Sequence, residues 1–383
     1  MNNRERFNAV MHYQPRDRSP ICDFGFWAET LPIWKEQGLP AEVYYNGQDN
    51  NHEEFFGMDF GMDKVDGATG VTAGLAPHFP VEVLEDQGDH ELIQQADGVR
   101  VRRRKFMGSI PMPMGHLLED RDSWRKYYKP RLDPSHPARY PADWAERVKV
   151  WTDPDRENVI ALPGGSLYGW LRNWIGVENL SLIVYDDPVW FEEMVSTVAD
   201  CIIGTLSRIL ETGGQFDGCS MWEDMCYNSG PLLHPKHFKK FLQPHYRRIT
   251  DLLHAHGVDV IWLDCDGNID LLIPLWLEVG INCMFPLEIG TWNADPIRYR
   301  REYGRDLLIL GGFDKHILAQ SKEAIEREVH RLAPLVEEGG YIGFCDHRVP
   351  PDVPLENYLF YLQTVRRVWG HDINLNPMKV DVS

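Results

Sequence analysis

The chain has 383 residues, of which 43% are hydrophobic, and its formal net charge at pH 7 is -19. This length and composition suffice for a large packed core, and the acidic balance argues against a surface that follows nucleic-acid phosphates. The polar N-terminus contains no signal-peptide core or membrane-spanning run. Seven scattered cysteines without paired spacing argue against a disulfide framework. We therefore expect a cytoplasmic protein that binds neither membranes nor nucleic acids.

The first part of the chain mixes several kinds of predicted element. In chain order they are a helix at 3–12, a strand at 20–22, helices within 28–60 and an antiparallel excursion near residues 80–105. The excursion is indicated by alternating valines and by the turn signal Asp97-Gly98. Residues 110–156 are rich in Pro, Asp and Arg, so we expect surface loops and a short helix there.

From residue 157 predicted strands and helices alternate, which indicates a parallel sheet. The strands are at 159–162, 216–221, 258–263, 281–285, 306–310 and 340–344, and helices lie between them. With the early strands their number approaches eight, so we predict an α/β fold, a (β/α)8 TIM barrel formed by one domain over 1–383. A doubly wound open sheet is the alternative. The first strand is not followed by GxGxxG, which argues against its dinucleotide-binding version.

Ionisable and aromatic side chains follow directly after several predicted strands. Because the chemistry of a (β/α)8 barrel lies where its strands end, we expect these side chains to share one site. The candidates for catalysis are Glu223, Asp224, Asp314 and Lys315. The candidates for substrate binding are Asp23, Trp27, Trp222, Glu288 and Asp346, and the candidate metal ligands are Asp264, Asp266 and His347.

The metal candidates depend on the spacing of two carboxylates. Asp264 and Asp266 lie two residues apart just past a strand, so alternation points both side chains the same way. With His347 from another strand end, they form a ligand set for a divalent metal. The alternative is that the two Asp residues cap the helix that follows. Cys265, which lies between them, is predicted to be a core residue rather than a thiolate ligand.

The other candidates have competing interpretations. Glu223 or Asp224 is expected to act as a base or hydrogen-bond acceptor, and the alternative is a loop carboxylate paired with an arginine. Lys315, which follows Asp314, either binds an anionic group or pairs with an acidic neighbour. Several tryptophans near strand ends are typical of core packing, although together at one barrel mouth they would suit a flat or apolar substrate. These are Trp27, Trp170, Trp174 and Trp222.

Several longer motifs resemble the uroporphyrinogen decarboxylase superfamily. They are EEFFGMD at 53–59, WEDMCYNSGPLLHP at 222–235, DCDGNIDLLIPLWLEVGIN at 264–282, GGFDK at 311–315 and GYIGFCDHRVPPDVPLENY at 340–358. The resemblance extends over nearly the whole chain and is specific for the superfamily rather than for one activity. It implies a (β/α)8 barrel with its site at the C-terminal mouth, and it makes a homodimer plausible.

The superfamily contains two kinds of enzyme. True uroporphyrinogen decarboxylases grip a polycarboxylated porphyrinogen through arginines after the first strand, whereas this chain has no Arg between Arg18 and Arg100. The second kind comprises zinc-dependent methyltransferases that work with corrinoid proteins through a His-x-Cys motif and a later Cys. Aligned by Gly267-Asn268 and by the later Pro-Leu-Glu-Asn, those ligand positions are occupied here by Asp264, Asp266 and His347.

From these observations we expect a methyltransferase that moves a methyl group between a small methylated substrate and a corrinoid on a separate protein. The oxygen-rich set would hold zinc or another divalent metal, and it suits a methyl ether or amine better than a thiol. The alternative is cofactor-free decarboxylation of a porphyrinogen or another carboxylated substrate, with Arg16, Arg18, Arg172 and Arg348 gathered at the mouth. A third possibility is a non-catalytic barrel that senses a small ligand; the many ionisable residues at strand ends argue against it.

Overall fold

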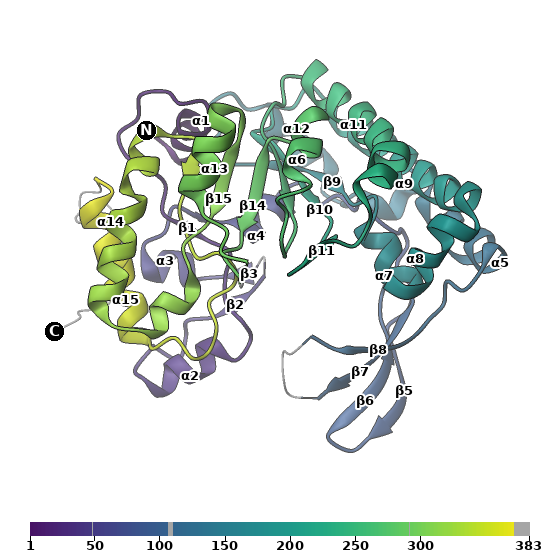
Figure 1. Ribbon diagram of the computed structural model, residues 1–383, viewed down its shortest axis with the longest axis horizontal. Helices are drawn as coiled ribbons and strands as arrows, with labels where there is room; N and C mark the ends of the chain where they lie inside the picture. Colours follow the sequence, from purple (N-terminus) through teal and green to yellow (C-terminus); the bar gives the residue numbers. More distant parts are fainter. Residues whose placement is uncertain (48, 106–109, 291, 371–383) are drawn as a thin grey trace.

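The computed structural model describes residues 1–47, 49–105, 110–290 and 292–370. Its centre is a ring of short parallel strands surrounded by helices (Figure 1). The strands are β1 (Cys22–Asp23), β4 (Phe60–Gly61), β9 (Ala161–Gly165), β10 (Gly218–Trp222), β13 (Ile261–Asp264), β14 (Cys283–Leu287), β15 (Leu308–Gly311) and β16 (Tyr341–Ile342). Six of them pair in the order β16-β15-β14-β13-β10-β9, and β1 pairs with β4. A parallel bridge from Phe26 to Val349 joins the segments that follow β1 and β16. These features confirm the predicted (β/α)8 barrel.

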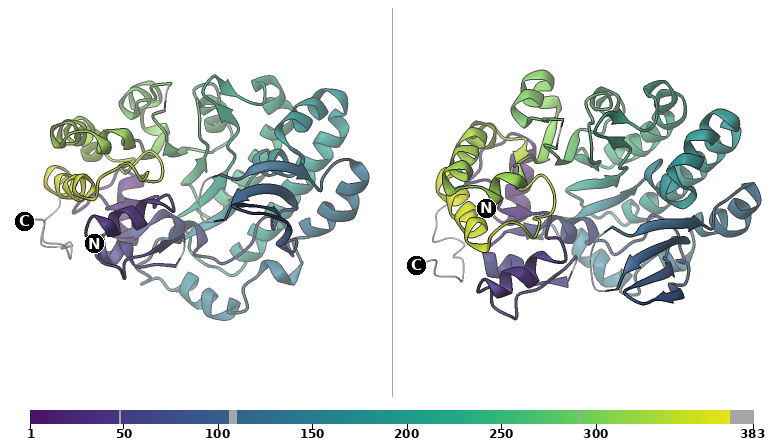
Figure 2. Two further views of the ribbon diagram at one scale, coloured as in Figure 1. Left: turned by 90° about the horizontal axis from the view of Figure 1, so that it is seen from below. Right: turned by 60° about the horizontal axis from the view of Figure 1, so that its bottom comes forward.

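Helices surround the strands on the outside of the barrel (Figures 1 and 2). They include α2 (Thr30–Glu36), α3 (His52–Phe56), α4 (Met62–Gly67), α6 (Trp144–Thr152), α7 (Gly169–Ile175), α8 (Val177–Asp186), α9 (Pro188–Leu210), α11 (Gln243–Ala255), α12 (Ile273–Glu278), α13 (Pro296–Tyr303), α14 (Lys322–Glu338) and α15 (Leu355–Val368). Shorter segments are α5 (Arg121–Ser123), α10 (Pro235–His237), the π-turns Trp124–Tyr128 and Phe238–Leu242, and 3-10 turns at Lys129–Leu132, Pro137–Arg139, Gly304–Asp306 and Lys315–Ala319.

Alternation along the strands divides the core in two. On β13, Ile261 and Leu263 pack in the cluster between strands and outer helices, whereas Trp262 belongs to the cluster inside the barrel. Successive side chains of a strand point to opposite faces, which explains this division. Asp264 is the last residue of β13 and continues the inward-facing series. The strand therefore carries one carboxylate to the mouth of the barrel.

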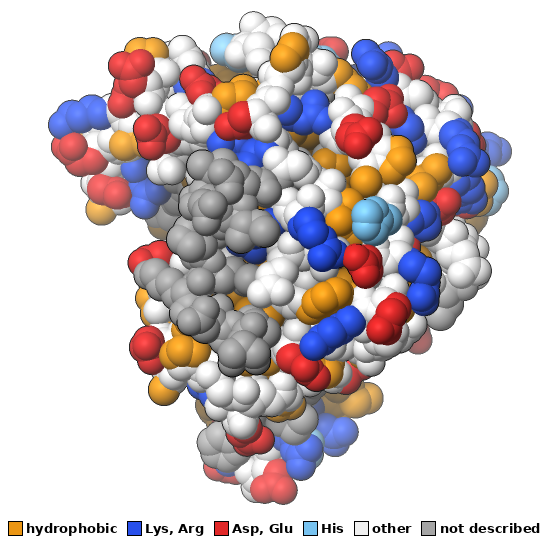
Figure 3. All heavy atoms as spheres, turned by 90° about the vertical axis from the view of Figure 1, so that its left-hand side faces the viewer, with side chains coloured by type: hydrophobic (Ala, Val, Ile, Leu, Met, Phe, Trp, Pro, Cys, Tyr) orange, Lys and Arg blue, Asp and Glu red, His pale blue; other side chains and the backbone are white. Residues whose placement is uncertain are grey.

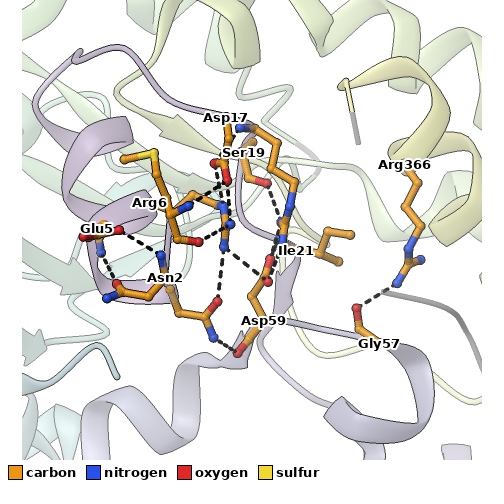
Figure 4. Close-up of polar contacts among 12 residues, drawn as sticks. Asn2, Glu5, Arg6, Asp17, Ser19, Ile21, Gly57, Asp59 and Arg366 are labelled. Atoms are coloured by element: carbon orange, nitrogen blue, oxygen red, sulfur yellow. Dashed lines mark hydrogen bonds and ion pairs between the residues drawn. The ribbon is translucent and has the colours of Figure 1, made fainter. Parts of the chain in front are cut away.

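Helix α1 (Asn3–Met11) closes the N-terminal end of the barrel. Its side chains Phe7, Val10 and Met11 belong to the interior cluster. The neighbouring loops are held by buried charge pairs, and Figure 4 shows Arg6 between Asp17 and Asp59. Because α1 closes this end of the barrel, we expect the site at the opposite end.

The insertion is an antiparallel sheet that projects from the barrel (Figures 1 and 2). Its strands are β5 (Glu82–Gln87), β6 (His90–Gln94), β7 (Val99–Arg104) and β8 (Met112–His116). The predicted excursion near residues 80–105 is confirmed, but the sheet also includes β8, which lies where we expected loops. Pro113 weakened the strand signal there, and an edge strand such as β8 tolerates a proline.

The region 28–60, which we predicted to be helical, is another correction. It contains α2 and α3, but also the hairpin β2 (Tyr45–Asn46) and β3 (Asp49–Asn50) and the start of β4. Two-residue strands are too short to produce an apolar run, so pattern reasoning does not detect them. Strand β11 (Cys226–Tyr227) and strand β12 (Gly230–Pro231) form a second small hairpin after β10.

The surface on the side of α14 and α15 carries basic and acidic side chains interspersed with scattered hydrophobic ones (Figure 3). This mixture is typical of a solvated face rather than of a continuous basic patch. Among the described residues, no helix combines the length and the apolar character needed to cross a membrane.

Candidate functional site

Three carboxylates converge where β10 and β13 end. Trp222, the last residue of β10, pairs with Asp264, the last residue of β13. Asp224 and Asp266 each follow two residues later, in the adjoining loops. One oxygen from each of Asp224, Asp264 and Asp266 lies within 4.8 Å of the others. We call these three residues the carboxylate cluster.

Backbone contacts hold the two loops of the cluster together. The Glu223 N–H donates to the Asp264 carbonyl over 2.8 Å, and the Asp266 N–H donates to Asp224 Oδ1 over 3.2 Å. Asp224 has a φ of +41°, a left-handed conformation that non-glycine residues adopt infrequently. The side chain of Asp224 is thereby placed against the loop after β13.

The carboxylates of the cluster repel one another. Burial raises the pKa of Asp264 well above its ordinary value, and the charges of Asp266 and Asp224 raise it further. Burial and the charge of Asp266 likewise raise the pKa of Asp224. The guanidinium of Arg172 is 3.7 Å from Asp224 Oδ2, too far for a strong hydrogen bond. Buried like charges of this kind are typical of functional sites.

This donor set fits a divalent cation. Asp266 Oδ1 is buried and has no hydrogen-bond partner within the described part of the chain, and such an atom normally has a partner. Three carboxylate oxygens form a hard ligand set that suits oxygen-preferring divalent ions and can also bind zinc. A cation would neutralise the repulsion that raises the pKa of Asp264.

His347 borders the cluster at Asp266. Its Nε2 lies 3.5 Å from Asp266 Oδ2, and its ring stacks on Trp27 with centroids 5.5 Å apart. Burial alone would lower the pKa of His347, but the hydrogen bond and charge of Asp266 outweigh burial and the pKa is raised. The predicted ligands Asp264, Asp266 and His347 therefore lie in one region, while the compact group of donor oxygens includes Asp224 as well.

Glu223 lies beneath the cluster in the protein interior. Its carboxylate accepts hydrogen bonds from the Leu167, Tyr168 and Gly169 N–H groups over 2.7, 2.8 and 2.8 Å. The hydroxyls of Ser166 and Tyr246 also donate to it. Glu223 is fully buried, and burial raises its pKa despite these donors. This arrangement favours a positioning role, anchoring the loop that leads into α7, over the predicted role of a base in the pocket.

A second charged group forms the adjacent wall. Lys315 Nζ lies 3.4 Å from Asp346 Oδ1 and 3.5 Å from Glu288 Oε1. Burial would lower the pKa of Lys315, but the two carboxylates raise it. Asp346 is fully buried and accepts from the Lys315 and Ile289 N–H groups. Glu288 Oε2 accepts from the Gly267 N–H, which connects this wall to the cluster.

The remaining candidates lie at the edge of this region. Asp314 caps the 3-10 turn that follows it, with its Oδ1 accepting from the His316 N–H over 2.9 Å. Asp23 Oδ2 is 3.0 Å from His52 Nε2 in a buried pair. Trp222 has the Arg172 guanidinium 5.4 Å from its ring centroid. Asp314 and Asp23 are thus placed in local structural contacts, whereas Trp222 lines an open cavity.

Sequence reasoning missed two residues of the mouth. Asp63 and Asp66 lie on α4, and their charges help to raise the pKa of Asp264. Burial raises the pKa of Asp66 itself to about 7. Arg348 holds Asp63 through contacts of 2.9 and 3.1 Å. The i, i+3 spacing of Asp63 and Asp66 was the available signal, but β4 before them was not recognised as a strand.

The arginines that a decarboxylase would need are dispersed. Arg18 binds Asp59 over 2.5 Å at the closed end of the barrel, and Arg16 donates to the Glu337 carbonyl at the end of α14. Arg348 is engaged with Asp63, as described above. Arg172 donates to the Asp224 carbonyl. Two of the four therefore lie away from the mouth.

Comparisons with known proteins agree with this architecture. The model of the family "Uroporphyrinogen decarboxylase (URO-D)" matches residues 173–368. A curated uroporphyrinogen decarboxylase from Syntrophotalea carbinolica is 25% identical over 197 residues, covering 49% of this chain and 52% of the relative. One from Thermus thermophilus is 27% identical over 139 residues, covering 36% and 38%. The chain thus spans about half the length, or less, of these curated relatives.

A solved methyltransferase from Methanosarcina mazei has a similar fold. Its TM-score is 0.56 at 14% sequence identity, and the match covers 96% of this chain and 99% of that chain. At this identity the likeness concerns the fold alone. The family model, in contrast, matches just over half of the sequence and includes the strands that carry the carboxylate cluster. The chain therefore belongs to the uroporphyrinogen decarboxylase family.

Proposed function

We propose that this protein is a methyltransferase that moves a methyl group between a small methylated substrate and a corrinoid protein, assisted by a divalent metal. The observation that carries the proposal is the carboxylate cluster, whose three donor oxygens lie within 4.8 Å of one another. A group of partly buried carboxylates that is short of cationic partners destabilises the fold. Such groups are found mostly at functional sites. The fold shared with a methyltransferase supports the same assignment.

Asp224, Asp264 and Asp266 would hold the metal. When bound, such an ion supplies positive charge that polarises the heteroatom bearing the methyl group. The bond from the methyl carbon to this heteroatom breaks and its electron pair stays on the heteroatom. The methyl carbon bonds to the reduced corrinoid of the partner protein, whose own electron pair forms the new bond. The leaving heteroatom also needs a proton unless it leaves as a neutral amine.

The residues around the cluster would orient the substrate and supply that proton. His347, held between Trp27 and Asp266, would present its imidazole as the proton donor. Lys315 and Glu288 form a charged wall beside the cluster. Glu223 fixes the loop before α7 and so keeps Trp222 and Asp224 in place.

Metal content is the first test. Purified, tag-free protein is incubated with zinc, manganese or magnesium, dialysed and analysed by elemental analysis, with Asp264→Asn and Asp266→Asn beside it. We expect one ion per chain in the wild type and an affinity at least about tenfold weaker in each variant. Asp259→Asn is the matched control, because Asp259 is a surface carboxylate. It should keep the wild-type metal content.

The metal-loaded protein is then assayed with methylated amines and ethers and a reduced corrinoid protein, following demethylation of the substrate. Activity that falls together with metal content in Asp264→Asn supports the proposal. A wild-type protein that binds none of the three ions would contradict it.

The alternative is decarboxylation of a carboxylated substrate, which the names of the curated relatives favour. It would use the mouth as an acid–base site without a metal. Release of carbon dioxide from a porphyrinogen by the metal-free protein would support it. Loss of that activity in Arg348→Gln, with Arg16→Gln unaffected, would assign the substrate to the mouth.

A further inference from the structure

A cavity of about 480 Å³ lies beside the carboxylate cluster. It is bounded by the ends of β9 and β10, the start of α7, the segment 72–78 and Asp97 in the turn before β7. Trp222 and Ser220 line it from β10, and Trp222 pairs with Asp264 of the cluster. Asp66 also lines it and accepts a hydrogen bond from Trp262 Nε1, two residues before Asp264. The cavity therefore adjoins the strand end that carries Asp264. Its volume is in the range of small-molecule sites.

Three indole rings form part of the cavity wall. Trp170 and Trp174 on α7 stack with ring centroids 6.0 Å apart and an interplanar angle of 17°, and Trp222 contributes a third ring. Two glycines leave room for Trp170. A Cβ at Gly165 would lie 2.7 Å from the Trp170 ring, and one at Gly74 would lie 3.3 Å from it. The backbone is thus built around the ring, which holds the aromatic wall in place.

The charge that faces the cavity is acidic. Of the described residues that line it, Asp66 and Asp97 are carboxylates, His78 stands at the exposed edge, and none is Lys or Arg. Asp97 is fixed by its own turn, since its Oδ1 accepts from the Val99 N–H over 3.0 Å. Asp66 is fixed by Trp262 Nε1 at 3.1 Å. Asp66 also has a side-chain hydrogen bond with Ser220 of the lining, whereas Asp97 Oδ2 is left for a further partner because a carboxylate offers several acceptor positions.

An indole of this wall already attracts a cation. The Arg172 guanidinium, which lies outside the cavity lining, is 5.4 Å from the ring centroid of Trp222. Indole rings bind cations over their faces through the ring quadrupole, and the attraction is strongest where water is excluded. Aromatic cages combined with carboxylates are a recurrent arrangement for quaternary ammonium groups.

We propose that this cavity binds a small methylated ammonium cation, with Trp170, Trp174 and Trp222 around the methyl groups and Asp97 supplying the opposite charge. This inference rests on the proposed function, because it identifies the substrate of the methyl transfer as a methylated ammonium ion. The positively charged nitrogen of such a substrate is itself the leaving group and has no lone pair for a metal, so the metal held by the carboxylate cluster would not bind that nitrogen. The transfer breaks one C–N bond, and the nitrogen retains that electron pair and leaves as the neutral amine. The methyl carbon bonds to the reduced corrinoid of the partner protein, whose own electron pair forms the new bond. No proton is then needed for departure of a quaternary amine.

Other ligand classes fit the lining less well. An anion would meet two carboxylates without a basic side chain among the described lining residues. A neutral aromatic ligand would fill the space between the indoles but would leave Asp97 desolvated without a countercharge, which is unfavourable. A cation with apolar methyl groups satisfies both the rings and Asp97.

Binding is tested on the full-length, metal-free protein by isothermal titration calorimetry. The probes are choline and its neutral isostere 3,3-dimethyl-1-butanol, which has the same shape without the charge. We expect choline to bind at least about tenfold more tightly than the isostere, which corresponds to about 1.4 kcal/mol. Equal affinity of the two probes, or no binding of choline, would overturn the proposal.

Variants show whether choline occupies this cavity. Asp97→Asn keeps the oxygen that accepts from Val99 and removes only the charge, so choline affinity should fall about fivefold or more while the isostere is unaffected. Asp89→Asn is the matched control, because Asp89 is an exposed carboxylate in the other turn of the same sheet. It should leave choline affinity unchanged.

Trp170→Leu should weaken choline binding about tenfold, and circular dichroism checks that it folds. If this variant does not fold, the comparison of Asp97→Asn with Asp89→Asn decides alone. Choline affinity that is unchanged in Asp97→Asn would place the cation elsewhere and overturn the proposal. Because these measurements involve neither metal nor methyl transfer, they can fail while metal binding at the carboxylate cluster succeeds, and the reverse.

Discussion

The two ends of the barrel use aspartate in opposite ways. At the closed N-terminal end Asp17 and Asp59 have basic partners. Arg18 binds Asp59 through two contacts of 2.5 and 2.6 Å, and Arg6 pairs with Asp17 (Figure 4). Burial alone would raise the pKa of Asp59, but the hydrogen bonds from Arg18 and the Ile21 N–H, with the arginine charges, lower it. The closed end therefore favours the charged carboxylate.

In the carboxylate cluster at the mouth the same residue type lacks such compensation, although Asp63 and Asp346 nearby are paired with Arg348 and Lys315. Asp264 shares its surroundings with Asp224 and Asp266, and its pKa is raised by burial and by their charges. A lowered pKa means that the charged form stabilises the fold, and a raised pKa means that it destabilises the fold. The difference indicates that the charged carboxylates at the closed end stabilise the fold and that those of the carboxylate cluster destabilise it. Loss of stability at a functional site is a recurrent trade-off.

The largest effect is expected from breaking a pair at the closed end. Asp59→Asn removes the charge that partners the buried Arg18 guanidinium. Loss of one partner of a buried pair destabilises by about 3–5 kcal/mol, so the free energy of unfolding in urea should fall by this amount. The control is Asp259→Asn, whose partner is the exposed His12, and a change below about 1 kcal/mol is expected there. An equal loss in both variants would remove the distinction between the buried and exposed pairs.

Glu223 lies near the mouth and yet is fully hydrogen-bonded. It therefore tests whether the hydrogen-bond partners of a carboxylate, rather than its place in the barrel, decide its effect on stability. Glu223→Gln places an amide NH₂ against backbone donors, which leaves buried groups unpaired and should destabilise the protein by about 2–3 kcal/mol. Thermal and urea unfolding measure this, with Glu82→Gln at the exposed start of β5 as the control. A stable Glu223→Gln protein would mean that these donors find other partners.

The contribution of Asp59 to the free energy of unfolding should also depend on pH. The pKa of Asp59 is lowered in the folded protein, whereas in the unfolded chain it is about 3.9. As pH falls, the unfolded state takes up the proton first, so the Asp59 contribution is complete above about pH 4 and is lost as pH falls through the folded pKa. The loss is about 1.4 kcal/mol for each unit by which the pKa is lowered.

The measurement is the difference in unfolding free energy between wild type and Asp59→Asn from pH 8 to pH 3. This difference should be constant above about pH 5 and should narrow below about pH 4. A difference that widens at low pH would contradict the lowered pKa.

Many of the strands and several carboxylates of the mouth could be predicted from the sequence. The residues that were not predicted were missed for physical reasons. Apolar runs before Asp264 and Asp346 located their strands, because buried parallel strands are continuously apolar. Strand β4 has two residues and gives no such run, so Asp63 and Asp66 after it were overlooked. The position of Asp66 against Trp262 depends on packing between segments almost 200 residues apart, which no local pattern reveals.

The roles of neighbouring carboxylates were harder still to assign. Glu223 and Asp224 are adjacent, and the sequence offered no reason to separate them. The structure directs Glu223 into the interior, toward the N–H groups of Leu167 and Gly169, and places Asp224 in the cluster. The positive φ at Asp224 directs the two side chains to different places, and the residue types do not predict this backbone conformation.

The smallest and most discriminating effect is expected from Asp264→Asn, the same change as at Asp59 but at the open end. It removes a buried charge that Asp224 and Asp266 repel, so the metal-free protein should become more stable by about 1 kcal/mol. Urea unfolding in the presence of a chelator measures this directly. Adding the metal should reverse the order, because a ligand at 100 times its dissociation constant stabilises the wild type by about 2.7 kcal/mol and the variant by less. A loss of stability in Asp264→Asn without metal would mean that the carboxylate is already compensated and that the mouth resembles the closed end after all.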